Sequence, residues 1–222
     1  MGDGRPGDAV EAYGRSVEEA VRAVLLQLGV RAEDAEVSVL DEGARGWLGL
    51  GARPARARAR RLNKGEAAER FLRRLATLVG SPLRVEVSVP GSGAEDGWSV
   101  DVQSDDPGRW IGRHGRGVDA LQLLCEVAAA RASGDRRRLS LDMGGYRGRR
   151  TQVLEATARR MADAAKRLGR EVALEPMPAA DRRVVHAAVQ GIPGVRTEST
   201  GEEPRRHVII VPDGVRAQVG HG

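Results

Sequence analysis

Residues 111–124 have the sequence IGRHGRGVDALQLL, and this stretch decides which fold we expect. It opens with two basic or potentially basic side chains between two glycines: Gly112, Arg113, His114 and Gly115. Glycine has no Cβ, so another backbone can approach closely, and the apolar spacing after the tetrad predicts a helix whose free amides face it. This arrangement suits the phosphodiester groups of a nucleic-acid strand. A lone GxxG is more often an ordinary tight turn, so its surroundings matter.

The elements on either side of the tetrad predict a small domain. A helix is expected over residues 63–79, and two alternating strands at 83–89 and 98–102 form a hairpin with an acidic tip. After the tetrad, a helix begins near residue 118 and a strand covers residues 139–143. This order is that of the bacterial-type KH domain, whose GXXG loop clamps the backbone of about four nucleotides.

The N-terminal part of the chain predicts a second small unit. Ser16 and Glu19 have the spacing of a capping box, and an apolar stripe over residues 17–28 indicates the helix that it begins. Residues 55–60 alternate between alanine and arginine, so a strand there carries its arginines on one face. Those arginines either extend a nucleic-acid track or protect an edge strand from pairing with another sheet.

The C-terminal part predicts one long helix and a third unit. Residues 146–168 keep a continuous helical pattern, and at about 1.5 Å per residue such a helix is long enough to join two modules. A short strand near residue 172, a helix over 178–189 and two strands at 195–200 and 208–211 follow.

Basic side chains on this third unit form a second candidate site. Arg182 and His186 lie one helical turn apart, so both could reach one phosphate, although an isolated pair with this spacing is more often an ordinary surface pair. Arg205, Arg206 and His207 complete the patch if their strand lies beside the helix.

Composition and motifs argue against an enzyme. The only cysteine among the 222 residues, Cys125, can form neither an internal disulfide nor a thiolate metal site. The four histidines lack metal-ligand spacing, and neither a nucleophile triad nor a nucleotide-binding loop is present. We therefore expect no catalysis, no cofactor and no metal. The chain also lacks an apolar stretch of about 20 residues and a hydrophobic signal core, so we expect a cytoplasmic protein without membrane insertion.

Three arginines open the long helix, where cations oppose the helix dipole: Arg147, Arg149 and Arg150. Either Asp142 or an RNA phosphate is expected to offset their charge. Trp110, just before the tetrad, is expected to pack against the KH sheet rather than to stack on a base.

Taken together, the chain resembles the Jag family of bacterial proteins, also called KhpB or EloR. These proteins combine a Jag-N domain, a KH domain and a domain named for its Arg-xxx-His motif. The likeness covers about residues 12–211 and rests on several motifs in the same order: residues 14–20, 46–51 with 54–56, 111–124, 141–142 with 146–147, 175–177 and 182–186. Two departures are a tether of only about residues 62–64 after Jag-N, and Pro178-Ala179-Ala180 in place of polar and aromatic residues before the Arg-xxx-His motif.

The resemblance implies an α+β chain of three small modules. The type II KH module has the order α-β-β-α-α-β, Jag-N is a helix with short strands, and the C-terminal module is a small sheet with helices. The expected bounds are a disordered N-terminus at 1–9, Jag-N at 10–61, KH at 62–145, a connecting helix at 146–168, the Arg-xxx-His domain at 169–213 and a loose tail at 214–222.

The resemblance also implies a function: non-catalytic binding of single-stranded RNA, as a post-transcriptional regulator or RNA chaperone linked to cell elongation, division and cell-wall control. The KH contacts would come from Gly112, Arg113, His114, Gly115 and Arg116. The Arg-xxx-His contacts would come from Arg182, Arg183, His186, Arg205 and Arg206, with Arg147, Arg149 and Arg150 as secondary candidates.

Protein partners follow from the same resemblance. They are a small single-domain KH protein that forms a heterodimer, and an unidentified partner that docks on Jag-N, with a membrane-associated protein as one candidate. The alternative function is a protein adaptor whose KH domain mainly mediates dimerisation; the intact GxxG favours RNA binding.

Overall fold

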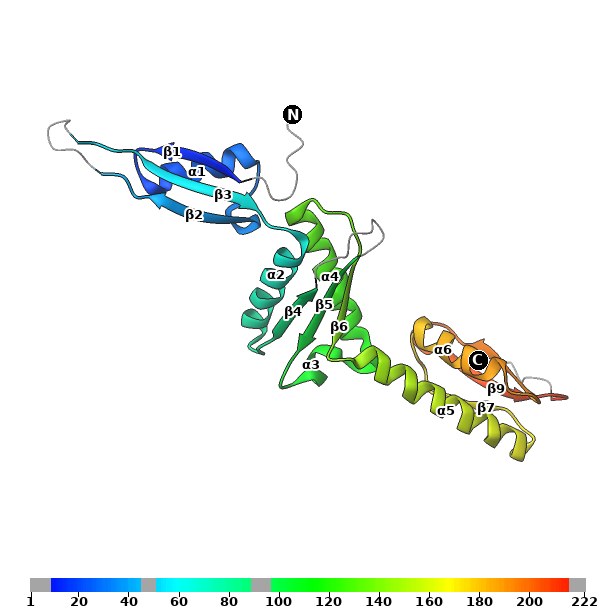
Figure 1. Ribbon diagram of the computed structural model, residues 1–222. Helices are drawn as coiled ribbons and strands as arrows, with labels where there is room; N and C mark the ends of the chain where they lie inside the picture. Colours follow the sequence, from blue (N-terminus) through cyan, green and yellow to red (C-terminus); the bar gives the residue numbers. More distant parts are fainter. Residues whose placement is uncertain (1–8, 45–50, 89–96, 216–222) are drawn as a thin grey trace. The chain divides into compact units, whose positions relative to one another are not determined.

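Figure 1 shows the computed structural model of the protein, which describes residues 9–44, 51–88 and 97–215. This part of the chain is α+β, as predicted, with three separate three-stranded sheets. The expected hairpin tip lies outside the described residues, as do most of the expected disordered N-terminus and C-terminal tail. No helix among the described residues is long and apolar enough to cross a membrane.

Internal contacts divide the chain into two compact units. One consists of Met1–Trp110 with Gly117–Gly144, and the other of Ile111–Arg116 with Gly145–Gly222. The GxxG tetrad therefore belongs to the same unit as the C-terminal part of the chain, although it is separated from it in sequence by a helix and a strand.

The N-terminal sheet contains β1 (Val10–Gly14), β2 (Ala35–Asp41) and β3 (Ala55–Arg61), with α1 (Val17–Leu28) against one face and a short 3-10 turn, η1 (Ala32–Asp34), before β2. Half of the expected capping box forms: the Ser16 hydroxyl accepts from the Glu19 amide at 3.3 Å. The Glu19 carboxylate instead accepts from the Arg15 amide at 2.8 Å, one residue earlier than a capping box requires.

The prediction that β3 carries its arginines on one face is confirmed: its alanines are buried, and its arginines face away from α1. The edge-strand interpretation of those arginines is wrong, because the strand order is β1-β3-β2 and β3 pairs on both sides. Two of them have partners on neighbouring elements: Arg56 pairs with Glu11, and Arg60 pairs with Glu36 and Glu66. Hydrogen bonding to Arg60 is the main cause of a lowered pKa at the Glu66 carboxyl.

The KH part follows the expected order: α2 (Lys64–Val79), β4 (Arg84–Ser88), β5 (Trp98–Gln103), α3 (Pro107–Ile111), α4 (Arg116–Ser133) and β6 (Leu139–Met143). A single 3-10 turn, η2 (Arg113–Gly115), lies between α3 and α4. β5 is central, antiparallel to β4 and parallel to β6. The predicted hairpin and third strand are confirmed. Trp110 is buried, and its indole donates to the Ser81 hydroxyl at 2.9 Å.

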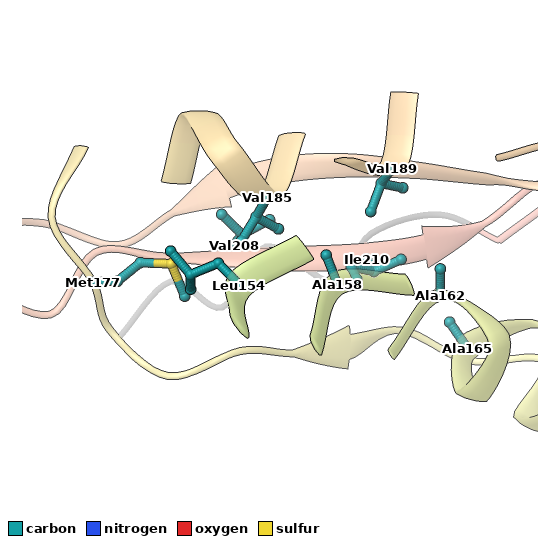
Figure 2. Packing of buried hydrophobic residues seen from close by; sticks show 9 residues of the cluster. All are labelled: Leu154, Ala158, Ala162, Ala165, Met177, Val185, Val189, Val208 and Ile210. Atoms are coloured by element: carbon teal, nitrogen blue, oxygen red, sulfur yellow. The ribbon is translucent and has the colours of Figure 1, made fainter. Parts of the chain in front are cut away.

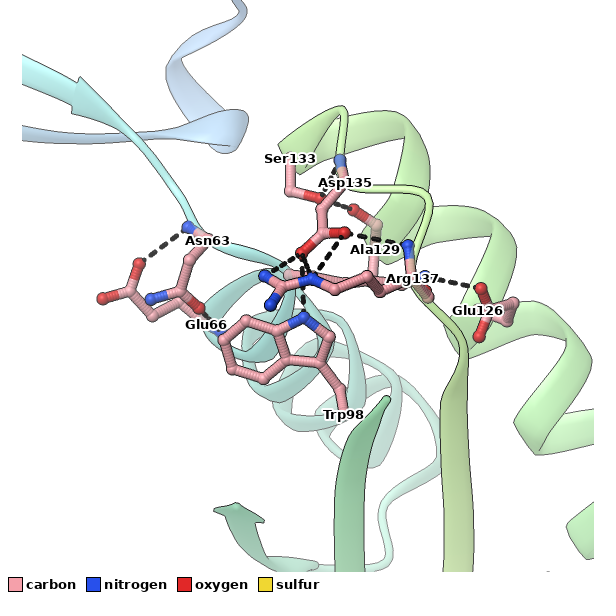
Figure 3. A network of polar contacts seen from close by, with 9 residues as sticks. Asn63, Glu66, Trp98, Glu126, Ala129, Ser133, Asp135 and Arg137 are labelled. Carbon is pink, nitrogen blue, oxygen red and sulfur yellow. Dashed lines mark hydrogen bonds and ion pairs between the residues drawn. The ribbon is translucent and has the colours of Figure 1, made fainter. Parts of the chain in front are cut away.

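Two polar clusters hold this sheet to its helices. In the first, drawn in Figure 3, the Asp135 carboxylate accepts from the Trp98 indole at 2.9 Å and from the Arg137 guanidinium at 2.6 Å. In the second, the fully buried Lys64 ammonium contacts the Glu126 carboxylate at 2.5 Å and the Arg137 carbonyl. The other oxygen of Glu126 accepts from the amide that begins β6, so a single ion pair joins α2, α4 and the sheet.

The C-terminal part contains α5 (Tyr146–Leu168), β7 (Val172–Ala173), α6 (Ala179–Gln190), β8 (Val195–Thr200) and β9 (His207–Pro212), with the strand order β7-β9-β8. The bounds of α5 are those that the sequence predicts. Small side chains of α5 let it lie close to the sheet, and α6 covers the same core (Figure 2).

Three leucines that helical spacing assigns to buried faces are exposed. Leu78 on α2, Leu124 on α4 and Leu168 on α5 each have more than half of their surface accessible.

Candidate nucleic-acid interface

The GxxG loop is a tight turn with three residues at positive φ. Gly112 has φ 67°, His114 has φ 55° and Gly115 has φ 80°. Left-handed backbone at a residue with a side chain is uncommon, and here it lies next to helical backbone at Arg113. Alternation of right- and left-handed residues turns successive amides toward the same side, which is a favourable geometry for an anion.

The two glycines of the tetrad have different roles. Gly112 is exposed, so the backbone of a nucleic-acid strand can approach the peptide backbone there. Gly115 is buried, and a Cβ on it would lie 2.8 Å from Cε1 of Tyr146. The expectation that both glycines are open to a ligand is therefore wrong for Gly115, because the ring that begins α5 covers it.

Arg150 connects the loop to the C-terminal helix α6. Its guanidinium donates to Asp181 at 2.8 Å and lies 3.3 Å from Nδ1 of His114. A carboxylate that offsets the charge of this arginine is thus Asp181, a residue that neither sequence interpretation named. Arg147 and Arg149 are more exposed on the same helix, and an RNA contact by either stays a prediction.

Arg182 lies inside the C-terminal part rather than on its surface. Only 7% of the residue is exposed. Its guanidinium donates to the Met177 carbonyl at 2.7 Å and pairs with Glu203 at 2.8 Å. The side chain therefore joins the segment before α6 to the turn before β9.

His186 is held between two hydroxyls of β8, Thr197 at 2.7 Å and Ser199 at 2.8 Å. Burial, and then the charge of Arg182, lower the pKa of its imidazole. Both side chains of the Arg-xxx-His pair are engaged with protein groups, and direct contact of either with a phosphate stays a prediction.

A cleft of about 630 Å³ lies between the loop and the C-terminal domain. Its loop side is basic or potentially basic, and its other side consists of the segment before α6 and the turn before β9. The lining residues are Arg113, His114, Arg116, Glu175, Pro176, Met177, Pro178, Glu203, Pro204 and Arg205. Four of the predicted site residues thus come together here: Arg113, His114, Arg116 and Arg205. Arg183 and Arg206 are exposed outside this lining.

Sequence reasoning missed the acidic and aromatic residues that shape the site. Four of them were not among the predicted site residues. The Tyr146 ring covers Gly115, and Asp181 accepts from Arg150. Glu175 and Glu203 line the cleft, and Glu203 also pairs with Arg182. The sequence did offer one signal for Asp181: it lies in the first turn of α6, where the helix dipole favours a carboxylate.

Three domain families match the chain in the order that the fold shows. The Jag N-terminus family matches residues 12–61, and the KhpA/KhpB KH domain family matches residues 69–141. The Arg-xxx-His domain family, whose name comes from an arginine and a histidine separated by three residues, matches residues 152–212. These are the three domains that the sequence predicts.

Two of the similar curated proteins match along most of the chain. A protein of Clostridium symbiosum named RNA-binding protein KhpB is 37% identical over 204 residues, which is 91% of each chain. A protein of Bacillus subtilis with the same name is 29% identical over 90% of this chain and 97% of its own. A namesake in Streptococcus pneumoniae matches only half of this chain and about a third of its own length, at 29% identity. The chain therefore belongs to the KhpB family, the Jag family that its motifs indicate.

Proposed function

We propose that this protein is a non-catalytic, single-stranded RNA-binding protein that acts in the cytoplasm as a post-transcriptional regulator or RNA chaperone. The observation that supports this most strongly is the cleft beside the GxxG loop, where Arg113, Arg116 and Arg205 converge. An exposed glycine with basic neighbours suits an RNA backbone, and the names of the relatives point to the same ligand. A link to cell elongation, division and cell-wall control is part of this proposal.

The chemistry of the described residues supports a binding role rather than catalysis. The Cys125 thiol is buried, and burial raises its pKa to about 12, which makes it a poor nucleophile. Within the part of the chain that the structure describes, no three histidine, cysteine, aspartate or glutamate side chains cluster in a way that could hold a metal ion.

Charge reversal in the loop tests this function. Replacing both Arg113→Asp and His114→Asp should weaken binding of a fluorescent twelve-nucleotide single-stranded RNA at least tenfold, measured by anisotropy. Aspartate tolerates the left-handed backbone at position 114, so the fold should persist and the thermal melt should be unchanged.

The matched control is Arg160→Glu with Arg167→Glu, two exposed arginines on α5 that do not line the cleft. It removes more positive charge than the loop variant. If both variants weaken binding equally, net charge explains the effect and the proposed site is wrong.

Salt dependence gives a second measurement. A clamp on about four nucleotides should give a slope of about −3 in a plot of log affinity against log salt, at about −0.7 per phosphate neutralised. An affinity that does not depend on salt would contradict a phosphate clamp.

Dimerisation is the second candidate function, and an exposed apolar face on α4 favours it. Leu123, Leu124 and Val127 are each more than half exposed on this helix. Such a face suits a second KH domain, including that of a small single-domain KH protein. Leu124→Asp should then abolish dimers in light scattering while single-stranded RNA still binds; a wild-type chain that stays monomeric alone and with such a protein would exclude this role.

The N-terminal sheet is the surface that we propose for protein docking. Tyr13 and Leu40 are exposed on β1 and β2, and Arg56 lies over the Tyr13 ring with its guanidinium carbon 5.7 Å from the ring centroid.

A further inference from the structure

We propose that the GxxG loop and the Arg-xxx-His domain form one continuous binding site for a single RNA strand, and not two independent sites. The inference rests on the proposed function and extends it. Its basis is that one cleft has walls from both: Arg113, His114 and Arg116 on the loop side, and Glu175, Met177 and Arg205 on the side of the Arg-xxx-His domain.

The two walls are held together by specific contacts within one compact unit. Arg150 bonds to Asp181 in the first turn of α6 and lies against the imidazole of His114. The Tyr146 ring packs on Gly115. A ligand on the loop therefore lies beside the wall of the Arg-xxx-His domain without any rearrangement of the chain.

Arg182 gives the wall of the Arg-xxx-His domain its form. It is buried and contacts two residues of the lining, the Met177 carbonyl and the Glu203 carboxylate. Glu203 stands in the turn that carries Arg205, whose amide donates to the Glu202 carbonyl at 2.7 Å. We assign Arg182 as a positioning residue that presents Arg205 to the cleft, while Arg205 itself contacts the strand.

The charge balance of the cleft fits a phosphate backbone. Glu203 is paired with Arg182, which leaves Glu175 as the one other carboxylate of the lining against Arg113, Arg116 and Arg205. A strand that follows the arginines from the loop to the turn before β9 keeps its phosphates near positive charge. Its bases then face the prolines and Met177, which offer apolar contact.

The test uses a fluorescein-labelled eight-nucleotide single-stranded RNA of mixed sequence and the full chain. A continuous site binds one octamer per chain. Arg113→Ala and Arg205→Ala should each weaken its binding about three- to tenfold, and the double variant should weaken it by about the product of the two. Both side chains are exposed, so neither variant threatens the fold.

Arg167→Ala, an exposed arginine outside the cleft, is the matched control and should change the octamer affinity less than twofold. The positioning role of Arg182 has a separate readout: Arg182→Leu should weaken octamer binding as much as Arg205→Ala, and combining the two should add nothing further. If Arg182→Leu does not fold, the comparison of Arg113→Ala, Arg205→Ala and their double variant decides the question.

Two outcomes overturn the inference and leave the proposed function intact. One is saturation at two octamers per chain, with each single variant removing one site. The other is an Arg205→Ala variant that binds the octamer as the Arg167→Ala control does. If the wild-type chain binds no single-stranded RNA at all, the proposed function fails first.

Discussion

The hydrogen bonds of the Asp135 carboxylate allow the loss of unfolding free energy on its replacement to be predicted. It accepts hydrogen bonds from the Trp98 indole and from the backbone and guanidinium of Arg137 (Figure 3), and 9% of its side chain is exposed. Burial by itself would raise the pKa of this carboxyl. The bonds from Arg137 and Trp98 outweigh burial and lower the pKa from 3.8 to about 2.

That shift converts into a free energy of unfolding. Each pKa unit corresponds to about 1.4 kcal/mol, so the ionised form of Asp135 stabilises the KH fold by about 2 kcal/mol at neutral pH. Asp135→Asn keeps an acceptor for one donor but removes the charge, and it should lose most of this amount. Because the folded-state pKa is depressed, the contribution is complete well above pH 4 and declines toward pH 2, with about half gone by pH 3.

Urea unfolding followed by tryptophan fluorescence measures the difference. All three tryptophans precede residue 111, so the signal reports the unit that contains Asp135. Urea is preferred because guanidinium salts would screen the ion pair. Glu42→Gln, which removes an exposed carboxylate from the same unit, is the control and should change stability by less than about 0.5 kcal/mol. A loss at Asp135→Asn no larger than this control, or a loss that is as large at pH 3 as at pH 7, would refute the reasoning.

Three further predictions concern packing and titration. Gly65→Ala should destabilise the KH unit by about 1–3 kcal/mol in urea, because the new Cβ would lie 2.6 Å from both Trp98 and Val87; a neutral result would mean that this contact relaxes freely. The Cys125 thiol should react with a thiol reagent only after unfolding, since it is buried and its pKa is raised to about 12; rapid reaction of the native chain would contradict this. Because the pKa of His186 is lowered below 6.5 in the fold, stability of the C-terminal unit should fall as pH decreases through 6.5, seen by circular dichroism; His186→Gln should lose this dependence, and an unchanged profile would assign it to other groups.

Local patterns predicted most of the elements. The bounds of α5 and the alternation in β3 are as expected, as is the hairpin of β4 and β5. These features depend on residues that are neighbours in the chain, because helical and strand periods decide which side chains share a face.

The candidate site was predicted in part. Arg113, His114, Arg116 and Arg205 do line one cleft. The interior position of Arg182 could not be read from its helix, since spacing places a side chain on a face but does not say what covers that face. The same limit applies to the exposed Leu124, for which helical spacing indicated burial.

From the sequence alone one obtains the three α/β modules, their order and the basic GxxG loop, because these follow from periodicity, glycine positions and the type of each side chain. The tertiary structure decided which residues far apart in the chain meet. It made β3 a central strand, placed the Tyr146 ring on Gly115, and gave Arg150 the carboxylate of Asp181. Such pairings depend on how the chain returns on itself in three dimensions, and charge or spacing along one segment carries no information about a partner on another.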